Sequence, residues 1–411
     1  MGIGIVGAGI SGLHLALRLQ QFGMEVTLYT AQDPEDIRTG PPLNFVTRFD
    51  STRKREVALG VTEWASSQFD NPWMHMRLEG ADLEFRGKLP SPASSVDFRM
   101  YLSGLLEELH RRDGKVARHA PLTRGELAKL AQRHDLLVVA AGRGAVTEVF
   151  PRDPARSPYD SAPRSLLGGL FTGVRPPEPA GMTMNMVPGA GEVHAPSYHS
   201  FGGMLTAILI EAVPGGPFEE VTLGDYRGDP DLLAKKVLDL ITHHAPSLRE
   251  RIDERAFGLA RPGDHMQGAL VPTVRHGVAQ VADGRFAVAI GDAWIVNDPL
   301  TAQGANLGSQ QAFEVAHLLS THSGPYDEAF CRMVSDTLWQ AAQPVVDWTN
   351  TFLGEPPPHV VKLLSAASAD QRVADAFVAN LDRPAEMWQS IRTPEDSTRF
   401  LAAVTDSGVV S

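Results

Sequence analysis

The sequence contains a single cysteine, Cys331, among 411 residues. One thiol cannot form an intramolecular disulfide or build a thiolate metal site alone. The cysteine content therefore does not decide between an oxidising and a reducing compartment, and the cytoplasm is the default expectation. The chain also lacks an excess of positive charge, because 37 Lys and Arg against 49 Asp and Glu give a net charge of −12. A negative charge of this size repels phosphate backbones and argues against nucleic acid as a partner.

Long apolar runs are absent as well. The strongest stretches, residues 136–141 and 204–210, fall far short of the roughly 20 residues that a membrane helix needs. The chain does not begin with the basic and apolar regions of a signal peptide, so we expect no membrane association. A hydrophobic fraction of 43% with 21% charged residues is typical of a globular protein. A chain of this length is too long to fold around a single hydrophobic core, so two or more lobes are expected.

The first thirty residues carry the clearest pattern. A short apolar strand at residues 3–6 leads into residues 7–12, Gly-Ala-Gly-Ile-Ser-Gly, which match GxGxxG. A helical pattern follows, and a second strand covers residues 25–29. In a dinucleotide-binding unit, Gly7 makes the tight turn, Gly9 lets the backbone approach a pyrophosphate, and Gly12 lets the helix pack on the strand. The flanking strand and helix predict dinucleotide binding rather than an empty glycine turn.

The acidic residue that NAD-binding units place at the end of the second strand is missing. Residues 29–32 are Tyr-Thr-Ala-Gln, and Asp33 follows two or three positions late. The ribose contact therefore falls to Thr30 or to a backbone group. This departure weakens a simple NAD interpretation.

A second glycine-rich element lies far downstream. An apolar strand that starts at residue 285 ends in Gly291-Asp292, and residues 298–304 are Asp-Pro-Leu-Thr-Ala-Gln-Gly before a helical pattern at about 309–319. The Asp can accept hydrogen bonds from a ribitol or ribose hydroxyl, and the turn offers N–H groups to an electron-rich ring or an oxyanion. An ordinary turn would explain either glycine element alone, but not both together.

The middle of the chain predicts a cofactor domain interrupted by a substrate domain. A helix at 98–109 has Asp97 as a plausible N-cap, and residues 135–142 form a continuous apolar strand that ends at Gly142. Residues 164–260 are typical of a mainly antiparallel sheet, with a helix at 231–243. A helix at 330–348 should kink or break at Pro344. We expect an α/β fold with a Rossmann-like domain (1–48, 92–160 and 262–330), a substrate domain (49–91 and 161–261) and a helical C-terminal region (331–411).

With both motifs in place, the sequence resembles the flavoprotein monooxygenases of the two-dinucleotide-fold type. In that family GxGxxG is followed much later by a strand ending in Gly-Asp and then by Asp-Pro-x-x-Gly-Gln-Gly. Ala302 stands at one of the family glycines. The resemblance narrows to the styrene and indole monooxygenases, the oxygenase halves of two-component systems, through residues 55–59 (Arg-Glu-Val-Ala-Leu) and 348–350 (Trp-Thr-Asn). It extends over nearly the whole chain.

The resemblance implies FAD as the cofactor, used in its reduced form. Reduced FAD and O2 would form a flavin hydroperoxide that epoxidises or hydroxylates an apolar aromatic alkene or indole-type substrate. No second GxGxxG follows a strand, so a separate nicotinamide domain is not expected, and an NADH-dependent flavin reductase would be the partner. The alternatives are a single-component NAD(P)H-dependent aromatic hydroxylase and a flavin protein without oxygenase activity. A homodimer remains one option for the assembly.

The same resemblance suggests the site residues. Asn44, Val46, Arg48 and Asn306 would lie at the reaction centre, with Arg48 standing where the styrene enzymes have a histidine. Arg99 would contact the FAD phosphates, with a surface salt bridge as the alternative. The predicted cofactor contacts are Gly7, Gly9, Ser11, Gly12, Thr30, Arg99, Gly142, Gly291, Asp292, Pro299, Gln303, Gly304, Ala305 and Asn306. The departures from the family fall on the pocket, which predicts a retained cofactor reaction on an altered substrate that could be larger than styrene or indole.

Overall fold

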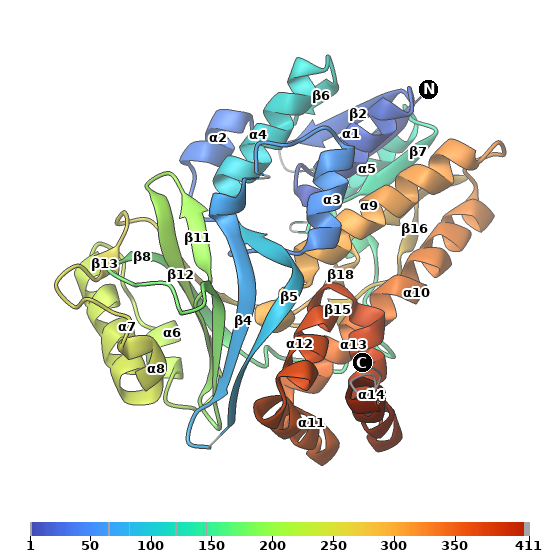
Figure 1. Ribbon diagram of the computed structural model, residues 1–411. Coiled ribbons are helices and arrows are strands. Elements are labelled where there is room, and N and C mark those ends of the chain that lie inside the picture. The colour runs from blue at the N-terminus through green and yellow to red at the C-terminus, as the bar shows by residue number, and fades with distance from the viewer. Residues whose placement is uncertain are drawn as a thin grey trace.

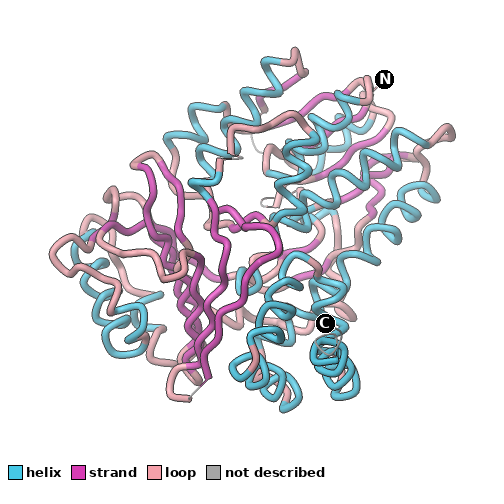
Figure 2. Tube along the Cα trace, in the orientation of Figure 1, coloured by secondary structure: helices cyan, strands magenta, loops and turns pink. Residues whose placement is uncertain are grey.

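The structure is a computed structural model, and it describes residues 2–64, 66–81, 83–119, 122–142, 144 and 146–406. Two sheets dominate the described part of the chain, with helices packed around them (Figures 1 and 2). The first sheet has six strands and carries the N-terminus, and the second has ten strands. The predicted α/β class with a helical C-terminal region is confirmed.

The six-stranded sheet is parallel except at one edge. Its strands, in spatial order, are β16 (Val278–Ala282), β17 (Arg285–Ala289), β7 (Leu136–Val139), β1 (Ile3–Val6), β2 (Val26–Thr30) and β6 (Lys115–Arg118), and only the β16–β17 pair is antiparallel. β1 and β7 are buried along their whole length, which explains their unbroken apolar sequence. The carboxyl ends of β1, β2, β7 and β17 therefore meet at one edge, where open α/β sheets bind ligands.

Helices cover this sheet on both faces. They are α1 (Ile10–Gln21), α2 (Pro34–Thr39), α4 (Phe98–Arg111), α5 (Arg124–Ala131), α9 (Gly304–Thr321) and α10 (Glu328–Leu353). Asp97 caps α4 as expected, because its side chain accepts from the N–H of Arg99. α10 passes through Pro344 without a break. The buried flanking positions, including Leu338 and Val345, hold both halves of that helix against the core.

The ten-stranded sheet is antiparallel except for the β4–β9 pair. Along its main path lie β13 (Gly258–Leu259), β8 (Ser165–Thr172), β12 (Gly203–Ala212), β10 (Gly191–His194), β9 (Gly181–Val187), β4 (Asp70–Leu78), β5 (Leu83–Ser95) and β3 (Thr47–Arg48), with β11 (Ser197–Ser200) on β12 and β14 (His265–Ala269) on β8. The short β15 (Thr273–Val274) and β18 (Ile295–Val296) pair separately. The mainly antiparallel character matches the pattern seen in the sequence.

Two helical groups pack beside this sheet (Figure 1). α6 (Glu219–Thr222), α7 (Pro230–His244) and α8 (Pro246–Arg249) share a core with β8, β10 and β12. α11 (Pro358–Ala369), α12 (Gln371–Ala379), α13 (Pro384–Ile391) and α14 (Pro394–Asp406) pack near β4 and β5. α3 (Asp50–Ala58) links β3 to β4. Short 3-10 turns complete the chain at η1 (Ser67–Phe69), η2 (Thr147–Val149), η3 (Gly291–Ala293), η4 (Pro299–Thr301) and η5 (Asn380–Asp382).

The larger sheet takes strands from both sides of the proposed domain boundaries. β3 lies before residue 49, β5 crosses residue 92, and β14 lies after residue 262. The division into a split cofactor domain, a substrate domain and a C-terminal region remains a proposal. Because β3 follows directly on the segment that leaves the first sheet, the two sheets meet where the site is formed.

Candidate active site

A cavity of about 1080 Å³ lies at the carboxyl edge of the six-stranded sheet. Its walls include the glycine loop after β1, the ends of β2 and β7, the turn after β17, the start of α9 and the loop before β3. Small-molecule sites usually measure about 300–1,000 Å³. The cavity is therefore large enough for a dinucleotide.

The glycine loop has the geometry that a pyrophosphate requires. Gly7 has a φ of +113°, and a Cβ there would lie 2.7 Å from the nitrogen of Ala141. A Cβ on Gly12 would lie 1.9 Å from the carbonyl oxygen of Gly7. A Cβ on Gly9 would meet nothing within 4 Å, so this position faces open space inside the cavity. The first turn of α1 carries no acidic side chain, which leaves its N–H groups and dipole available to an anion.

The two glycine motifs are packed against each other through Ser11. A Cβ on Gly291 would lie 2.5 Å from Ser11 Oγ, and a Cβ on Gly308 would lie 2.2 Å from it. Gly291 has a φ of +57°, and its N–H donates to Oε1 of Gln311 at 2.7 Å. Ser11 lines the cavity, whereas Gly12 and Gly291 support it from behind.

The late acidic residue after β2 is engaged elsewhere. Asp33 caps α2 by accepting from the N–H of Asp36, and it also pairs with Arg118 at 2.7 Å. Thr30 lines the cavity, but its hydroxyl donates to the carbonyl of Gln32 at 2.9 Å. A ribose contact at this end would therefore use Gln32, which also lines the cavity, or the backbone of residues 30–32.

The second motif supplies the opposite wall. Asp292 is exposed toward the cavity, and a Cβ on Gly142 would lie 2.5 Å from the Cβ of Asp292, so the strand end tolerates only glycine there. Pro299, Gly304 and Ala305 also line the cavity. The predicted contact Gln303 does not: it is buried, and its amide donates to the carbonyls of Thr301 and Leu381, which ties the turn to the C-terminal helices.

Ala302, which replaces a family glycine, adopts a left-handed conformation with a φ of +55°. A non-glycine residue in this region carries roughly 1 kcal/mol of strain. We expect Ala302→Gly to change the free energy of unfolding by less than about 1 kcal/mol, since relief of strain offsets the greater freedom of glycine in the unfolded chain. Ala302→Val should destabilise by about 1–2 kcal/mol, because a β-branched residue is excluded from this conformation. Urea unfolding of both variants tests this, and a larger loss in the glycine variant would contradict it.

Arg99 does not lie where the resemblance places it. Its guanidinium pairs with Asp97 at 2.6 Å and with Asp264 at 2.9 Å, and its side chain is 4% exposed. It is not among the described residues that line the large cavity. Two carboxylates neutralise this cation, so the geometry does not support a contact with FAD phosphates. The ion pair that the sequence offered as the alternative is present, but it is buried rather than on the surface.

Arg48 is likewise buried and not at the reaction centre. It is 0% exposed, donates to both carboxylate oxygens of Glu56 at 2.6 Å, and donates to Oγ of Ser94 at 3.1 Å. Glu56 also accepts from the Tyr101 hydroxyl at 2.8 Å. A side chain that is fully buried in an ion pair cannot reach a substrate. Arg48 instead stabilises the fold of the β3–α3 segment.

This ion pair continues into a longer buried network. Tyr101 Oη lies 2.8 Å from Nε2 of His14, and His14 Nδ1 lies 3.0 Å from Oγ of Ser309. Burial, with help from nearby arginines, lowers the pKa of His14 to about 3, so its ring is neutral. The network connects α1, α3, α4 and α9.

Asn306 does not line the large cavity but ties together segments that surround it. Its Oδ1 accepts from the N–H of Phe49 and the hydroxyl of Thr52, and its amide donates to the carbonyls of Thr47 and Ala302. All of its hydrogen-bonding groups are therefore used. Asn306 positions the start of α9 relative to β3 instead of contacting the substrate.

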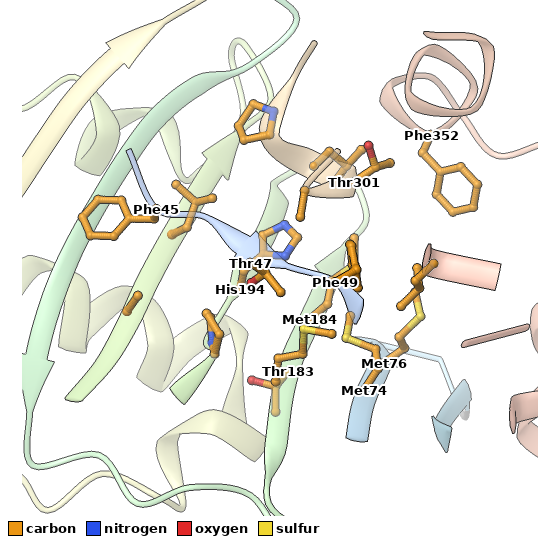
Figure 3. A pocket seen from close by; sticks show the side chains of 18 of the residues that line it. Phe45, Thr47, Phe49, Met74, Met76, Thr183, Met184, His194, Thr301 and Phe352 are labelled. Carbon is orange, nitrogen blue, oxygen red and sulfur yellow. The ribbon is translucent and has the colours of Figure 1, made fainter. Parts of the chain in front are cut away.

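A second, apolar cavity of about 90 Å³ adjoins the first (Figure 3). Side chains converge on it from the segment around β3, from β4 and β9, and from α10. It is lined by Phe45, Thr47, Phe49, Met74, Met76, Met182, Thr183, Met184, His194, Pro196, Ala207, Leu209, Pro299, Leu300, Thr301, Ala302, Trp348, Phe352, Phe377 and Leu381. Four of these, Phe45, Leu209, Pro299 and Ala302, line both cavities.

The loop before β3 separates the two spaces. Asn44 and Val46 line the large cavity, and Phe45 between them lines both. Asn44 is exposed, and its carbonyl accepts from the Tyr198 hydroxyl at 3.5 Å. Of the four residues predicted at the reaction centre, the structure brings Asn44 and Val46 to the cavity wall and leaves Arg48 and Asn306 behind it.

Comparison with known proteins identifies the family. A family model described as "Styrene monooxygenase A putative substrate binding domain" matches residues 142–251. Styrene monooxygenase StyA from Pseudomonas fluorescens is 34% identical over 398 residues, which cover 96% of this chain and 95% of that protein. StyA from a Pseudomonas sp. gives the same identity and coverage. The chain belongs to the styrene monooxygenase family.

Membership in the styrene monooxygenase family makes this chain an FAD-dependent monooxygenase that uses the reduced cofactor. The fold agrees with solved flavoproteins. The flavin-dependent brominase Bmp2 superposes with a TM-score of 0.71 at 13% identity, covering 99% of this chain and 98% of that one. A flavoprotein/dehydrogenase from Cytophaga hutchinsonii superposes with a TM-score of 0.68 at 12% identity, covering 99% and 100%. None of the described helices is both long and apolar enough to cross a membrane.

Several residues of this styrene monooxygenase site escaped prediction. The methionines of β4 and β9 recur at every second position, Met74 and Met76 and then Met182 and Met184, which places each pair on one face of its strand. This alternation is present in the sequence and is typical of strands with one buried face, but it does not indicate a cavity. Nothing in the sequence indicated that Glu211 would meet both His194, on a neighbouring strand, and Asp298.

Proposed function

We propose that this chain oxygenates a small apolar aromatic alkene or indole-type substrate in the methionine-lined cavity, with reduced FAD supplied by a separate flavin reductase. The observation that carries the proposal is the apolar cavity that shares a wall with the cofactor cavity at Phe45, Leu209, Pro299 and Ala302. Relatives named styrene monooxygenase support the substrate class. When bound, reduced FAD supplies the two electrons that split O2, so that one oxygen atom enters the substrate and the other leaves as water.

The residues of the chain would bind, orient and exclude water. The N–H groups after Gly9 would hold the pyrophosphate, and Asp292 would accept hydrogen bonds from the ribitol. Phe45 and Leu209 would place the substrate double bond beside the turn at Pro299. The methionines and Trp348 would keep the space dry, which favours oxygen transfer to the substrate over loss of peroxide to water.

The size of the apolar cavity bears on the substrate. At about 90 Å³ it is smaller than a cavity of about 150 Å³ that holds benzene. Styrene, which is larger than benzene, and any larger substrate therefore require the cavity to enlarge, which the unbranched methionine side chains allow by rearranging. A monocyclic alkene requires the smaller enlargement.

The test supplies reduced FAD directly. Protein mixed anaerobically with chemically reduced FAD and styrene, or with indole, should give styrene oxide or an indigo-type product on exposure to air. NADH and FAD without a reductase should give neither product nor NADH consumption, and addition of an NADH-dependent flavin reductase should restore turnover. Rapid NADH consumption by the chain alone would instead favour the single-component hydroxylase.

A cavity variant locates the substrate. Phe352, on α10, lines the apolar cavity, whereas Phe400, on α14, packs against the same core without lining it. Phe352→Ala should raise kcat/KM for a vinylnaphthalene relative to styrene about tenfold, since the added space accepts a second ring. Phe400→Ala is the matched control and should leave that ratio unchanged. Equal ratios in both variants would place the substrate elsewhere.

A further inference from the structure

A buried pair of carboxyl groups lies between the two cavities. Glu211, on β12, is 0% exposed, and Asp298, directly before η4, is 1% exposed. Their side chains are in hydrogen-bonding contact. Oδ1 of Asp298 accepts from the N–H of Leu300 at 3.1 Å. Both oxygens of Glu211 and Oδ2 of Asp298 find no N–H or O–H donor in the described part of the chain.

The groups around the pair cannot balance two buried negative charges. Arg164 is already paired with Glu192, with its Nε 2.9 Å from one carboxylate oxygen and its Nη2 3.0 Å from the other. Nε2 of His194 lies 3.3 Å from Oε1 of Glu211 but is not aligned for a hydrogen bond. Tyr159, which also faces Asp298, donates its hydroxyl to the carbonyl of Asn350 at 3.2 Å.

One proton shared between the two carboxyls satisfies both the contact and the charge. Burial raises the pKa of Glu211 to about 8. Burial, together with the neighbouring Glu211, raises the pKa of Asp298 well above its usual range. Burial lowers the pKa of His194, so its ring does not carry a balancing charge near neutral pH. Two carboxyls in contact titrate as a unit and retain one proton where isolated carboxyls would have lost theirs.

The position of the pair connects it to the chemistry. Asp298 lines the cofactor cavity and directly precedes Pro299. His194 lines the apolar cavity. Leu209, two residues before Glu211 and on the same face of β12, lines both. The carboxyl pair therefore lies in the wall between the two cavities.

We propose that Glu211 and Asp298 form a proton store for the oxygen-transfer step, with Asp298 donating into the cofactor cavity. Reduction of one oxygen atom of O2 to water uses the two electrons and two protons carried by reduced FAD, while the other atom enters the substrate. Asp298 donates a proton during oxygen transfer, and the pair regains a proton when water forms. The carboxyl pair is therefore not consumed in the overall reaction. The inference rests on FAD-dependent oxygenation and not on the identity of the substrate.

The first test detects the protonated carboxyl group directly, in the cofactor-free protein. Infrared spectra should show a deuterium-sensitive carbonyl band of a buried carboxylic acid at pH 6, and this band should fade as pH rises through about 8. Glu211→Gln and Asp298→Asn should each remove it, since the amide supplies a fixed donor in place of the shared proton. Asp298→Asn keeps an acceptor for the N–H of Leu300, so the turn should still form.

The control is Glu79→Gln. Glu79 is buried beside the same sheet, but its oxygens already accept from Asn185 at 2.6 Å and from Arg77 at 3.2 Å. The Glu79 variant should retain the acid band. An unchanged band in both Glu211→Gln and Asp298→Asn, with the fold confirmed by circular dichroism, would overturn the shared proton.

The second test measures whether the proton contributes to the reaction with O2, in the absence of any substrate. Single-turnover reoxidation of bound reduced FAD by O2 should show an inflection near pH 8 in the native protein. Both variants should lose the inflection and react about 100-fold more slowly, the usual contribution of a general acid. A profile identical to that of the native protein would overturn the role in oxygen transfer. If the protein fails to oxygenate styrene or indole, this result contradicts only the proposed substrate and not the proton store, because neither test uses a substrate.

Discussion

Replacing Gly9 with valine should abolish FAD binding while leaving the protein folded. A Cβ at this position meets nothing within 4 Å, and the backbone there has a φ of −77° and a ψ of 178°, which valine adopts readily. The free energy of unfolding should therefore change by less than about 1 kcal/mol. The isopropyl group would fill the space where a pyrophosphate meets the start of α1. We expect at least about a 100-fold loss of affinity, because both the close approach and the N–H contacts are lost.

Two comparisons separate lost binding from lost folding. In Gly12→Ala the new Cβ would lie 1.9 Å from the carbonyl of Gly7, so this variant should lose FAD and also several kcal/mol of stability. Gly125→Ala, in the first turn of α5, also has open space around its Cβ, but Gly125 does not line the cavity. It should match the native protein in both respects. Flavin fluorescence titration and urea unfolding supply the two readouts, and native-like FAD affinity in Gly9→Val would exclude the loop as the pyrophosphate site.

The cofactor half of the site was predictable because its geometry is local. GxGxxG places its glycines within six residues, and the steric demands on Gly7 and Gly12 arise from neighbours that the βαβ pattern itself brings together. The second motif is equally compact, and its Asp292 and Gly304 line the large cavity, while their contacts with FAD stay a prediction. In such motifs the residues that contact one another are close in sequence, so a pattern of residue types is enough to find them.

The substrate half was less predictable because its contacts are between distant segments. Arg48 and Arg99 were placed by resemblance, yet each is enclosed by carboxylates that no spacing rule indicates, Glu56 for the first and Asp264 for the second. The family segment at residues 55–59 gains a physical meaning here, since it supplies the counter-ion of Arg48. The segment at 348–350 likewise places Trp348 on the apolar cavity and binds Thr349 to Thr301 at 2.7 Å.

Breaking the buried Arg48–Glu56 pair should be among the most destabilising changes in the chain. The side chains are 0% and 4% exposed, so Arg48→Met would leave a carboxylate enclosed without its cation. Removing one partner of such a pair typically costs about 3–5 kcal/mol. The remaining donor to Glu56, the Tyr101 hydroxyl, is neutral and cannot replace the guanidinium. Urea unfolding should show this loss as a lower midpoint with an unchanged slope.

The double variant separates charge from packing. If the cost in Arg48→Met comes from an unpaired charge, then Arg48→Met with Glu56→Gln should recover most of it, because neither buried group is then ionised. Loss of packing alone would make the two substitutions additive. Arg111→Met, which breaks the exposed pair with Glu108, is the control and should cost less than about 1 kcal/mol. A loss confined to Arg48→Met would show that this ion pair stabilises the β3–α3 segment, which directly follows the Phe45 loop between the two cavities.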